Sequence, residues 1–189
     1  SSVSEKTKQK VMDVINQYGY TPNAFARGLG LNTMKTIGIL CADSSDLYTA
    51  KAVYYLEQLL RANGYNSILC CSGYDLDNRV KSMNLLLKQK VDAIILVGSS
   101  YIYESEAENK YITDAAAQTP VMLLNAALEA RNIYSILSDD HTSMYEATMH
   151  MLNSGVEDIL FFYNSTSYSS KRKLSGHLSA MKAFGLPER

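Results

Sequence analysis

Short apolar segments alternate with amphipathic segments along most of this chain, and that alternation constrains the fold more than any other feature. The apolar segments lie at residues 37–41, 67–71, 93–97, 121–124, 134–137 and 159–163. Most of them are apolar on both faces, which is typical of parallel strands that are covered by helices on both sides. Strands and helices that alternate at this spacing predict βαβ units and a doubly wound α/β fold with a parallel sheet.

Helical periodicity between these segments supplies the connections that a parallel sheet needs. Apolar residues recur at helical spacing over residues 53–60, and Gly64 is expected to end that helix. Further helices are predicted near residues 80–87, 111–118, 142–153 and 169–184. The intervening segment 101–110 carries three glutamates and is predicted to be an exposed excursion.

One more helix is predicted before the first strand. Ser4 can cap it, because a serine side chain can accept a hydrogen bond from an early backbone N–H. Val11 and its apolar neighbours then recur at helical spacing until Gly19 stops the helix. The next segment, residues 23–29, can form a short helix, although Gly28 disfavours it by about 1 kcal/mol.

The charge distribution along the chain is uneven. Residues 1–36 carry a net charge of +3, and the remaining residues carry −4. A basic N-terminal segment followed by an acidic remainder is typical of proteins that bind nucleic acid. No apolar segment is long enough to span a bilayer, and no signal-peptide pattern opens the sequence. We therefore expect a cytoplasmic protein with no membrane partner.

The three cysteines all occur in apolar segments. Cys41, Cys70 and Cys71 are predicted to be buried, reduced strand residues, which suits a reducing cytoplasm.

Motifs for catalysis are absent from the sequence. No Gly-rich phosphate loop follows the first apolar segment, no nucleophile elbow occurs, and no histidine has a metal-ligand spacing. We interpret Asp139, Asp140 and His141 as a turn that caps the next helix. The sequence therefore predicts no enzyme, no metal site and no cofactor.

A doubly wound sheet without catalytic residues still offers a binding site. Ligands bind such sheets beyond the carboxyl ends of the strands. The candidate ligand-binding residues follow three of the predicted strands, namely Asp43 and Tyr48 in segment 43–48, Ser99 in segment 98–100, and Asn125.

Three motifs carry a resemblance to a known family. They are V-S-x-x-T from Val3, G-Y-x-P-N-x-x-A-R-x-L from Gly19, and I-G-I from Ile37. At this spacing the sequence resembles the lactose-repressor (LacI/GalR) family of bacterial transcriptional regulators. The resemblance covers essentially the whole chain, and it is sharpest in the first forty residues.

The resemblance implies three parts. Residues 1–36 would be the remnant of a DNA-binding headpiece, comprising its third helix and its hinge helix. Residues 37–138 would be the nearly complete first lobe of an effector-binding core. Residues 139–189 would begin the second lobe. The implied architecture is that of the periplasmic binding proteins, with this chain truncated at both ends relative to the family.

The resemblance also implies DNA contacts. Residues 23–29 resemble the hinge helix that lies in the minor groove of operator DNA. Leu29 matches the leucine that wedges between base pairs and kinks the duplex. Ala26 matches the small residue at which two hinge helices pack, while Asn23 and Arg27 match polar positions that reach DNA or hold the hinge.

Several residues depart from the family pattern. Lys173, three residues before Gly176, replaces an arginine that holds the effector, and lysine lacks the bidentate fork. Asn125 replaces the usual aspartate, and Val156 replaces a histidine. These departures count against a conventional sugar effector. The expected partners are operator DNA, a small-molecule effector (a sugar or related metabolite) or a protein co-regulator, and a second copy in a homodimer.

Three functions compete on this sequence. The first is a DNA-binding regulator, a repressor, whose operator affinity is set by an effector between two α/β lobes. The second is a solute-binding protein of the same fold without a DNA role, and the third is an enzyme on a doubly wound sheet. The basic N-terminal segment and the missing export signal favour the regulator, and no motif supports the enzyme.

Overall fold

The computed structural model describes residues 3–19, 30, 33–156, 158–163 and 165–187. The chain divides into two compact units, residues 1–34 and residues 35–189. Each unit has its own elements.

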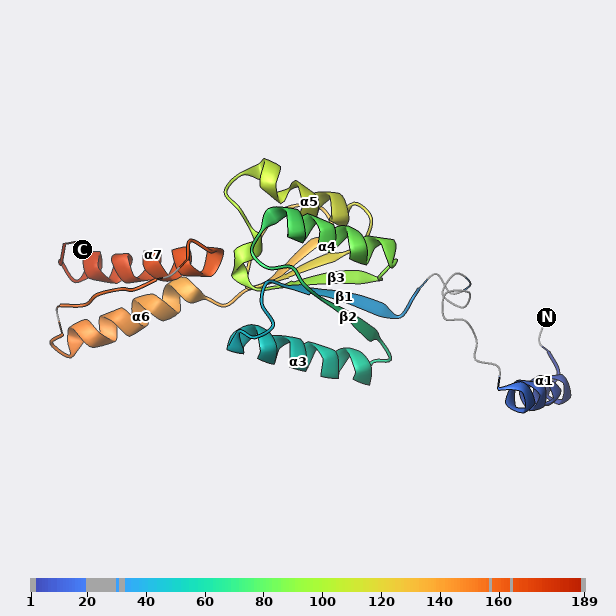
Figure 1. Ribbon diagram of the computed structural model, residues 1–189. Coiled ribbons are helices and arrows are strands. Elements are labelled where there is room, and N and C mark those ends of the chain that lie inside the picture. The colour runs from blue at the N-terminus through green and yellow to red at the C-terminus, as the bar shows by residue number, and fades with distance from the viewer. Residues whose placement is uncertain (1–2, 20–29, 31–32, 157, 164, 188–189) are drawn as a thin grey trace. The chain divides into compact units, whose positions relative to one another are not determined.

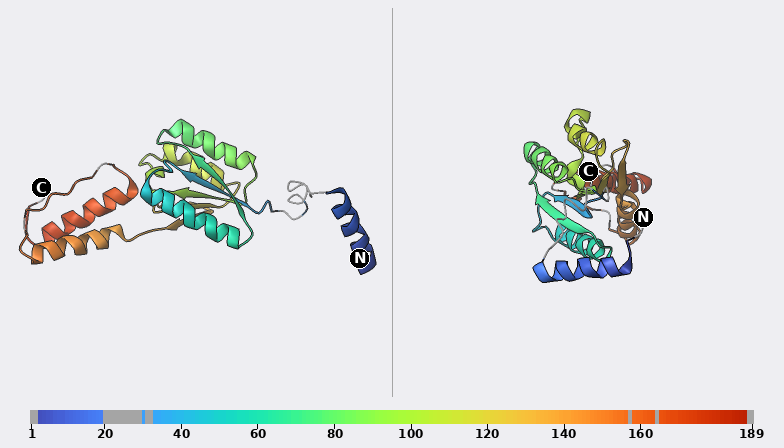
Figure 2. Two further views of the ribbon diagram at one scale, coloured as in Figure 1. Left: turned by 60° about the horizontal axis from the view of Figure 1, so that its bottom comes forward. Right: turned by 90° about the vertical axis from the view of Figure 1, so that its right-hand side faces the viewer.

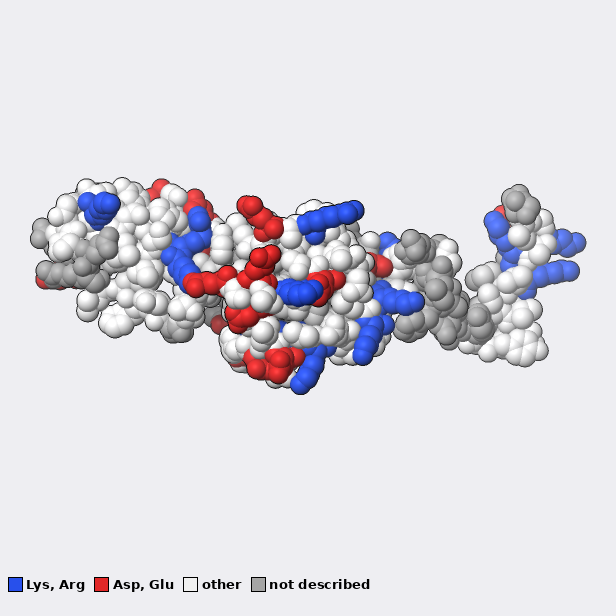
Figure 3. All heavy atoms as spheres, turned by 90° about the horizontal axis from the view of Figure 1, so that it is seen from above, with Lys and Arg blue, Asp and Glu red and all other residues white. Residues whose placement is uncertain are grey.

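The first unit contains helix α1 (Glu5–Tyr18). The Ser4 side chain accepts a hydrogen bond from the backbone N–H of Thr7, and Gly19 ends the helix in the left-handed conformation. Both ends of this helix are as the sequence predicts. No residue of α1 is buried, and lysine side chains project from it (Figure 3). The four candidate DNA contacts, Asn23, Ala26, Arg27 and Leu29, lie outside the described residues.

The second unit is built on a five-stranded parallel sheet with the strand order β2-β1-β3-β4-β5 (Figure 1). The strands are β1 (Thr36–Cys41), β2 (Asn66–Cys71), β3 (Ala93–Val97), β4 (Val121–Leu124) and β5 (Ile133–Ile136). Every neighbouring pair is parallel. This order is one of the two common doubly wound arrangements, so the predicted fold class is confirmed.

Helices cover both faces of this sheet, as Figures 1 and 2 show. Helix α3 (Leu47–Ala62) lies on one face, and α4 (Leu76–Lys88) and α5 (Glu106–Ala116) lie on the other. A short 3-10 helix, η1 (Ser99–Tyr101), follows β3. Two apolar clusters result, one on each face, with Ile39 and Val97 under α3 and Leu40 and Leu96 under α4 and α5. Because both faces of the sheet are covered, the side chains on both faces of most strands are apolar, and these strands are continuous apolar segments in the sequence.

Helices α6 (Asp140–Asn153) and α7 (Tyr168–Ala183) follow β5 and pack against each other. Gly176 lies in their interface, where a Cβ atom would stand 2.2 Å from the backbone oxygen of His141. Asp139 caps α6 by accepting a hydrogen bond from the backbone N–H of Thr142, so the interpretation of that turn as a cap is confirmed.

The strand predicted at residues 159–163 is wrong, because residues 158–163 are described and form no strand. A strand exists only when a neighbour accepts and donates its backbone hydrogen bonds, and none of the described strands lies beside this segment. Leu160, Phe162 and Tyr163 are largely exposed here.

Two burial predictions also need correction. Segment 101–110 is predicted to be exposed, but the side chain of Tyr101 is completely buried. Helix α5 also begins within this segment, at Glu106. Cys41 is buried as predicted, whereas Cys70 is half-buried and Cys71 is exposed. Cys71 is exposed because β2 is an edge strand of the sheet.

Among the described residues no helix combines the length and the apolar character needed to cross a bilayer.

Candidate functional site

A cleft of about 780 Å³ opens beyond the carboxyl ends of β1, β3 and β4. It is bounded on its other side by the first residues of α6 and by the residues that lead into and begin α7. Its lining is polar and includes seven serines, three aspartates and one lysine: Ser99, Ser100, Ser138, Ser165, Ser167, Ser169, Ser170, Asp43, Asp46, Asp140 and Lys173. The cleft is therefore suited to a ligand with many hydrogen-bonding groups.

All five residues that the sequence predicts for ligand binding line this one cleft. They come from widely separated positions: Asp43, Tyr48, Ser99, Asn125 and Lys173. The first four follow strands or begin the helix after one, and Lys173 lies on α7. The parallel sheet brings the first four together because the carboxyl ends of its strands share an edge, and α7 places Lys173 opposite them. Their role as ligand-binding residues stays a prediction.

The segment after β1 forms one wall of the cleft. The Asp43 carboxylate accepts hydrogen bonds from the backbone N–H and the hydroxyl of Ser45, at 2.8 and 2.7 Å. These two bonds lower the pKa of Asp43, so it is ionised at neutral pH. Asp46 caps α3 through the backbone N–H of Thr49. Both carboxylates thus have local structural partners and remain accessible to the cleft.

The segment after β3 forms the floor. Gly98 has φ +118°, a conformation that L side chains rarely adopt, and it turns the chain directly into η1. Behind this turn lies the fully buried guanidinium of Arg79, which donates to the carbonyl oxygen of Ser100 at 2.7 Å and to its hydroxyl at 3.1 Å. The rings of Tyr101 and Tyr103 flank the cation, which fixes it in place.

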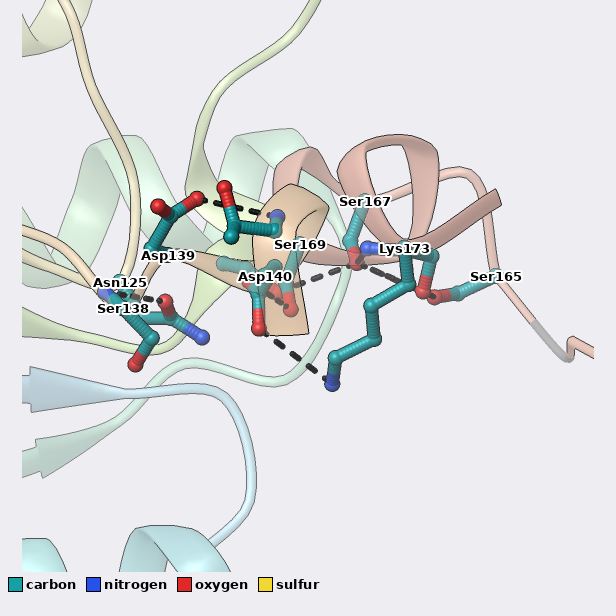
Figure 4. A network of polar contacts seen from close by, with 11 residues as sticks. Asn125, Ser138, Asp139, Asp140, Ser165, Ser167, Ser169 and Lys173 are labelled. Atoms are coloured by element: carbon teal, nitrogen blue, oxygen red, sulfur yellow. Dashed lines mark hydrogen bonds and ion pairs between the residues drawn. The ribbon is translucent and has the colours of Figure 1, made fainter. Parts of the chain in front are cut away.

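The segment after β4 turns at Asn125. This residue has φ +64°, which asparagine tolerates better than most residues, and its backbone N–H donates to the carbonyl oxygen of Ile136 at 2.7 Å. Its side-chain oxygen accepts a longer bond, 3.5 Å, from the backbone N–H of Ser138 (Figure 4). Asn125 therefore holds the ends of β4 and β5 together beside the cleft.

Asp140 is the most buried charged group of the lining. Its carboxylate accepts a 2.6 Å hydrogen bond from the hydroxyl of Ser169 and lies 3.7 Å from the ammonium nitrogen of Lys173 (Figure 4). The lysine is about half exposed at the mouth of the cleft. This carboxylate neutralises part of the lysine charge, so the pair presents both an acceptor and a donor to a ligand.

A cluster of serine hydroxyls lies at the N-terminus of α7. Ser167 caps this helix, and its hydroxyl also lies within hydrogen-bonding distance of Ser165, Ser170 and Ser99, at 3.0 to 3.2 Å. The contact with Ser99 links the floor of the cleft to α7. Because each hydroxyl both donates and accepts, this cluster can rearrange its bonds around a ligand.

Tyr48 completes the lining from the first turn of α3. Partial burial and, to a smaller extent, the Asp140 carboxylate raise the pKa of the Tyr48 phenol. The phenol is therefore protonated at neutral pH and available as a donor. Within the described part of the chain, no group of three or more histidines, cysteines and carboxylates could hold a metal ion.

Sequence reasoning missed Asp140 and the serines that lead into α7. Asp140 lies beyond the carboxyl end of β5, so the rule that located Asp43, Ser99 and Asn125 would have found it if applied to the fifth strand. The serines of residues 165–170 carry only a compositional signal. Their hydroxyls reach the cleft through the packing of α7 and η1, which a local sequence pattern does not encode.

Residues 34–189 match the sequence profile described as periplasmic binding proteins and sugar binding domain of LacI family. An HTH-type transcriptional regulator of Lachnoclostridium phytofermentans is 55% identical over 98% of this chain and 56% of its own length. Catabolite control protein A of Priestia megaterium is 29% identical over 100% of this chain and 56% of its own length. This chain thus spans about half the length of these curated relatives.

The fold also resembles solved structures. The crystal structure of the Lac repressor bound to ONPG in the repressed state superimposes with a TM-score of 0.80, at 18% identity, over 99% of this chain and 56% of that one. At this identity the likeness concerns the fold.

Proposed function

Because this chain belongs to the family of periplasmic binding proteins and LacI-type sugar-binding domains, we propose that it is part of a transcriptional repressor controlled by a small-molecule effector. The observation that carries the proposal is the polar cleft at the carboxyl edge of the sheet, lined by all five predicted binding residues. The 55% identical relative is named a transcriptional regulator, which favours this function over a solute-binding protein and over an enzyme.

The effector that suits the cleft is a polyhydroxylated molecule without a large negative charge, such as a sugar or related metabolite. Three aspartates face a single lysine, and Asp140 already neutralises part of that lysine charge. A second anion would therefore meet net repulsion, whereas sugar hydroxyls could both donate to carboxylates and accept from serine hydroxyls.

Effector binding would act on the contacts between the floor of the cleft and α7. Ser99 on η1 and Ser167 at the start of α7 are joined by a single 3.0 Å hydroxyl contact. A ligand that replaces this contact with several stronger ones favours one arrangement of the two lobes. Control follows if operator DNA prefers one of those arrangements.

Operator binding is proposed for the N-terminal part. On the family resemblance, residues 1–36 belong to the headpiece, and Asn23, Ala26, Arg27 and Leu29 form the hinge that contacts the minor groove. The protein would act in the cytoplasm, where its operator is.

A homodimer is the proposed assembly, and α3 supplies a surface for it. Tyr54, Tyr55 and Leu59 on this helix are 58%, 63% and 64% exposed. Large apolar side chains grouped on one helix are typical of association surfaces. A second copy of the same chain fits this role, since a palindromic operator is read by a two-fold symmetric pair.

The proposal is tested with the full-length protein and fragmented genomic DNA. The protein is expected to retain a small set of fragments at physiological salt, and one or more compounds from a panel of sugars and related metabolites should change that retention. If the protein instead retains all DNA sequences equally, and if retention depends strongly on salt, it binds DNA only non-specifically through the phosphates, and the proposal is wrong.

The role of the cleft is tested with Lys173→Met and Asp140→Asn. Both variants should weaken the response to the active compound at least about tenfold and leave DNA retention without that compound unchanged. Lys88→Met is the control, because Lys88 is an exposed lysine at the end of α4 and does not line the cleft. An unchanged response in both cleft variants would exclude this cleft as the effector site.

A further inference from the structure

Two cysteines meet at the carboxyl ends of neighbouring strands. Cys41 ends β1 and Cys71 ends β2, and the two residues are direct partners in the parallel register. Their sulfur atoms lie 3.7 Å apart. Neighbouring strands are about 4.8 Å apart, which falls within the range of about 4.4–6.8 Å between the Cα atoms of disulfide-bonded cysteines. Small side-chain rotations are therefore enough to bring the sulfurs into bonding distance.

The two thiols differ in access to solvent. Cys71 is exposed on the edge strand, whereas Cys41 is completely buried under α3. An oxidant in solution thus reaches Cys71 first, and Cys41 lies within reach of the product. Cysteines that undergo reversible oxidation are solvent-accessible and often lie beside a second, resolving cysteine.

Cys70 is the immediate neighbour of Cys71 in sequence, but it points to the other face of the sheet. Side chains alternate along a strand, and Cys70 packs against the cluster under α4 and α5. It is therefore an internal control for the pairing of Cys41 with Cys71.

We propose that Cys41 and Cys71 are a reversible redox pair, which closes to a disulfide on two-electron oxidation by a peroxide. The Cys71 thiolate attacks one peroxide oxygen, the O–O bond breaks, and the released hydroxide takes up a proton to give water. Cys71 is then a sulfenic acid. The Cys41 sulfur attacks the Cys71 sulfur, the S–O bond breaks, and the leaving hydroxide takes the Cys41 proton as a second water. Both cysteines are oxidised and the peroxide is reduced.

The resting state of the pair is the dithiol. Burial, together with the hydrogen bond and the charge of Cys71, raises the pKa of Cys41 to about 12, so Cys41 does not react by itself. A sulfenic acid on Cys71 places an electrophilic sulfur beside the Cys41 thiol, whose sulfur lies 3.7 Å away. This proximity favours the disulfide over further oxidation of Cys71.

The bond would form beside the cleft. Ala42 and Asp43, which follow Cys41, line the cleft, and so does Tyr74, three residues after Cys71. Ser72 already joins the two strand ends, because its hydroxyl lies 3.4 Å from the Cys41 carbonyl oxygen and 3.2 Å from the Tyr101 hydroxyl. Oxidation would thus add a covalent link to the rim of the cleft.

The test is a peptide map of the purified full-length protein after treatment with hydrogen peroxide. Trypsin places Cys41 in peptide 36–51 and the other two cysteines in peptide 62–79. The expected product is these two peptides joined, lighter than their sum by two hydrogen atoms and separated again by dithiothreitol. Cys71→Ser, at an exposed position, should abolish the joined peptide, and Cys70→Ser should leave its yield unchanged.

Three outcomes would overturn the proposal. One is a bond within peptide 62–79, which joins Cys70 to Cys71. Another is a covalent dimer on non-reducing electrophoresis, which joins Cys71 residues of two copies. The third is sulfinic or sulfonic acid at Cys71 while Cys41 still reacts with iodoacetamide after unfolding. Cys41→Ala should also remove the joined peptide, and thermal unfolding of each variant checks that it is folded.

Discussion

Among the glycines that the structure describes, Gly176 leaves the least room for a side chain. A Cβ atom there would stand 2.2 Å from the backbone oxygen of His141 and 3.1 Å from the backbone nitrogen of Tyr145. Backbone atoms of a packed helix cannot rotate away, so Gly176→Ala should separate α6 from α7. We expect the free energy of unfolding to fall by about 1–3 kcal/mol, measured by denaturant titration.

The sign of the change in the free energy of unfolding distinguishes a steric clash between the helices from the higher helix propensity of alanine. Gly to Ala in an exposed helix interior stabilises a protein by up to about 1 kcal/mol. Ser175→Ala is the matched control, because Ser175 is exposed one position earlier in α7, and it should change stability little. A stabilised Gly176→Ala variant would show that the two helices are not in this contact.

The cleft residues show what local sequence can and cannot predict. Asp43, Ser99 and Asn125 are predictable because each lies within two residues of the end of a strand, and the position of a strand end is a local property. The pairing of Asp140 with Ser169 was not predictable in this way. It depends on how α6 packs against α7, and a hydrogen bond between residues 29 positions apart leaves no periodic signal.

At the scale of elements, α6 and α7 share a buried histidine. His177 on α7 is 2% exposed, its Nδ1 atom lies 3.2 Å from the hydroxyl of Thr148 on α6, and its ring stacks on Phe161. Burial lowers the pKa of His177 below its ordinary value of 6.5. The unfolded chain therefore binds a proton that the folded chain does not, and this contribution to stability is complete above pH 6.5 and declines as the pH falls below it.

We expect the thermal midpoint to decrease between pH 7.5 and pH 5.5, and His177→Gln should reduce the slope of that decrease. His150→Gln is the control for the loss of a histidine at an exposed position on α6, and the slope of His177→Gln is compared with its slope. Equal slopes in the wild type and in His177→Gln would assign the pH dependence to other groups.

Helices and strands can be predicted from the sequence where local periodicity determines them, and less well where a strand depends on pairing with a neighbouring strand. The five strands of the sheet and the helices between them follow from alternating apolar and amphipathic segments. Residues 159–163 form a continuous apolar segment, as β3 does, but they form no strand, because a strand also needs a neighbour in register. Composition alone does not distinguish these two cases.

At the scale of the whole molecule, association through α3 is open to a direct test. Leu59→Glu places a charge within the exposed apolar group of that helix. If a second copy covers this group, each interface buries an unpaired carboxylate at a cost of about 1–3 kcal/mol or more. Sedimentation of the full-length protein should then show a dissociation constant at least about tenfold higher than that of the wild type.

Leu85→Glu is the control for that experiment. Leu85 is 49% exposed on α4, which covers the opposite face of the sheet from α3. It should leave the dissociation constant unchanged. A dimer that survives Leu59→Glu at the same concentration would place the interface elsewhere.

The strand order has a consequence for how the chain folds as a ribosome releases it. After β1 and β2 have paired, β3 joins the free edge of β1, β4 joins β3, and β5 joins β4. Each new strand therefore pairs with a strand that has already been synthesised, and domains fold from the N-terminus during synthesis. The nascent sheet can therefore grow in one direction, with a single unfinished edge at a time on the side where the next strand arrives.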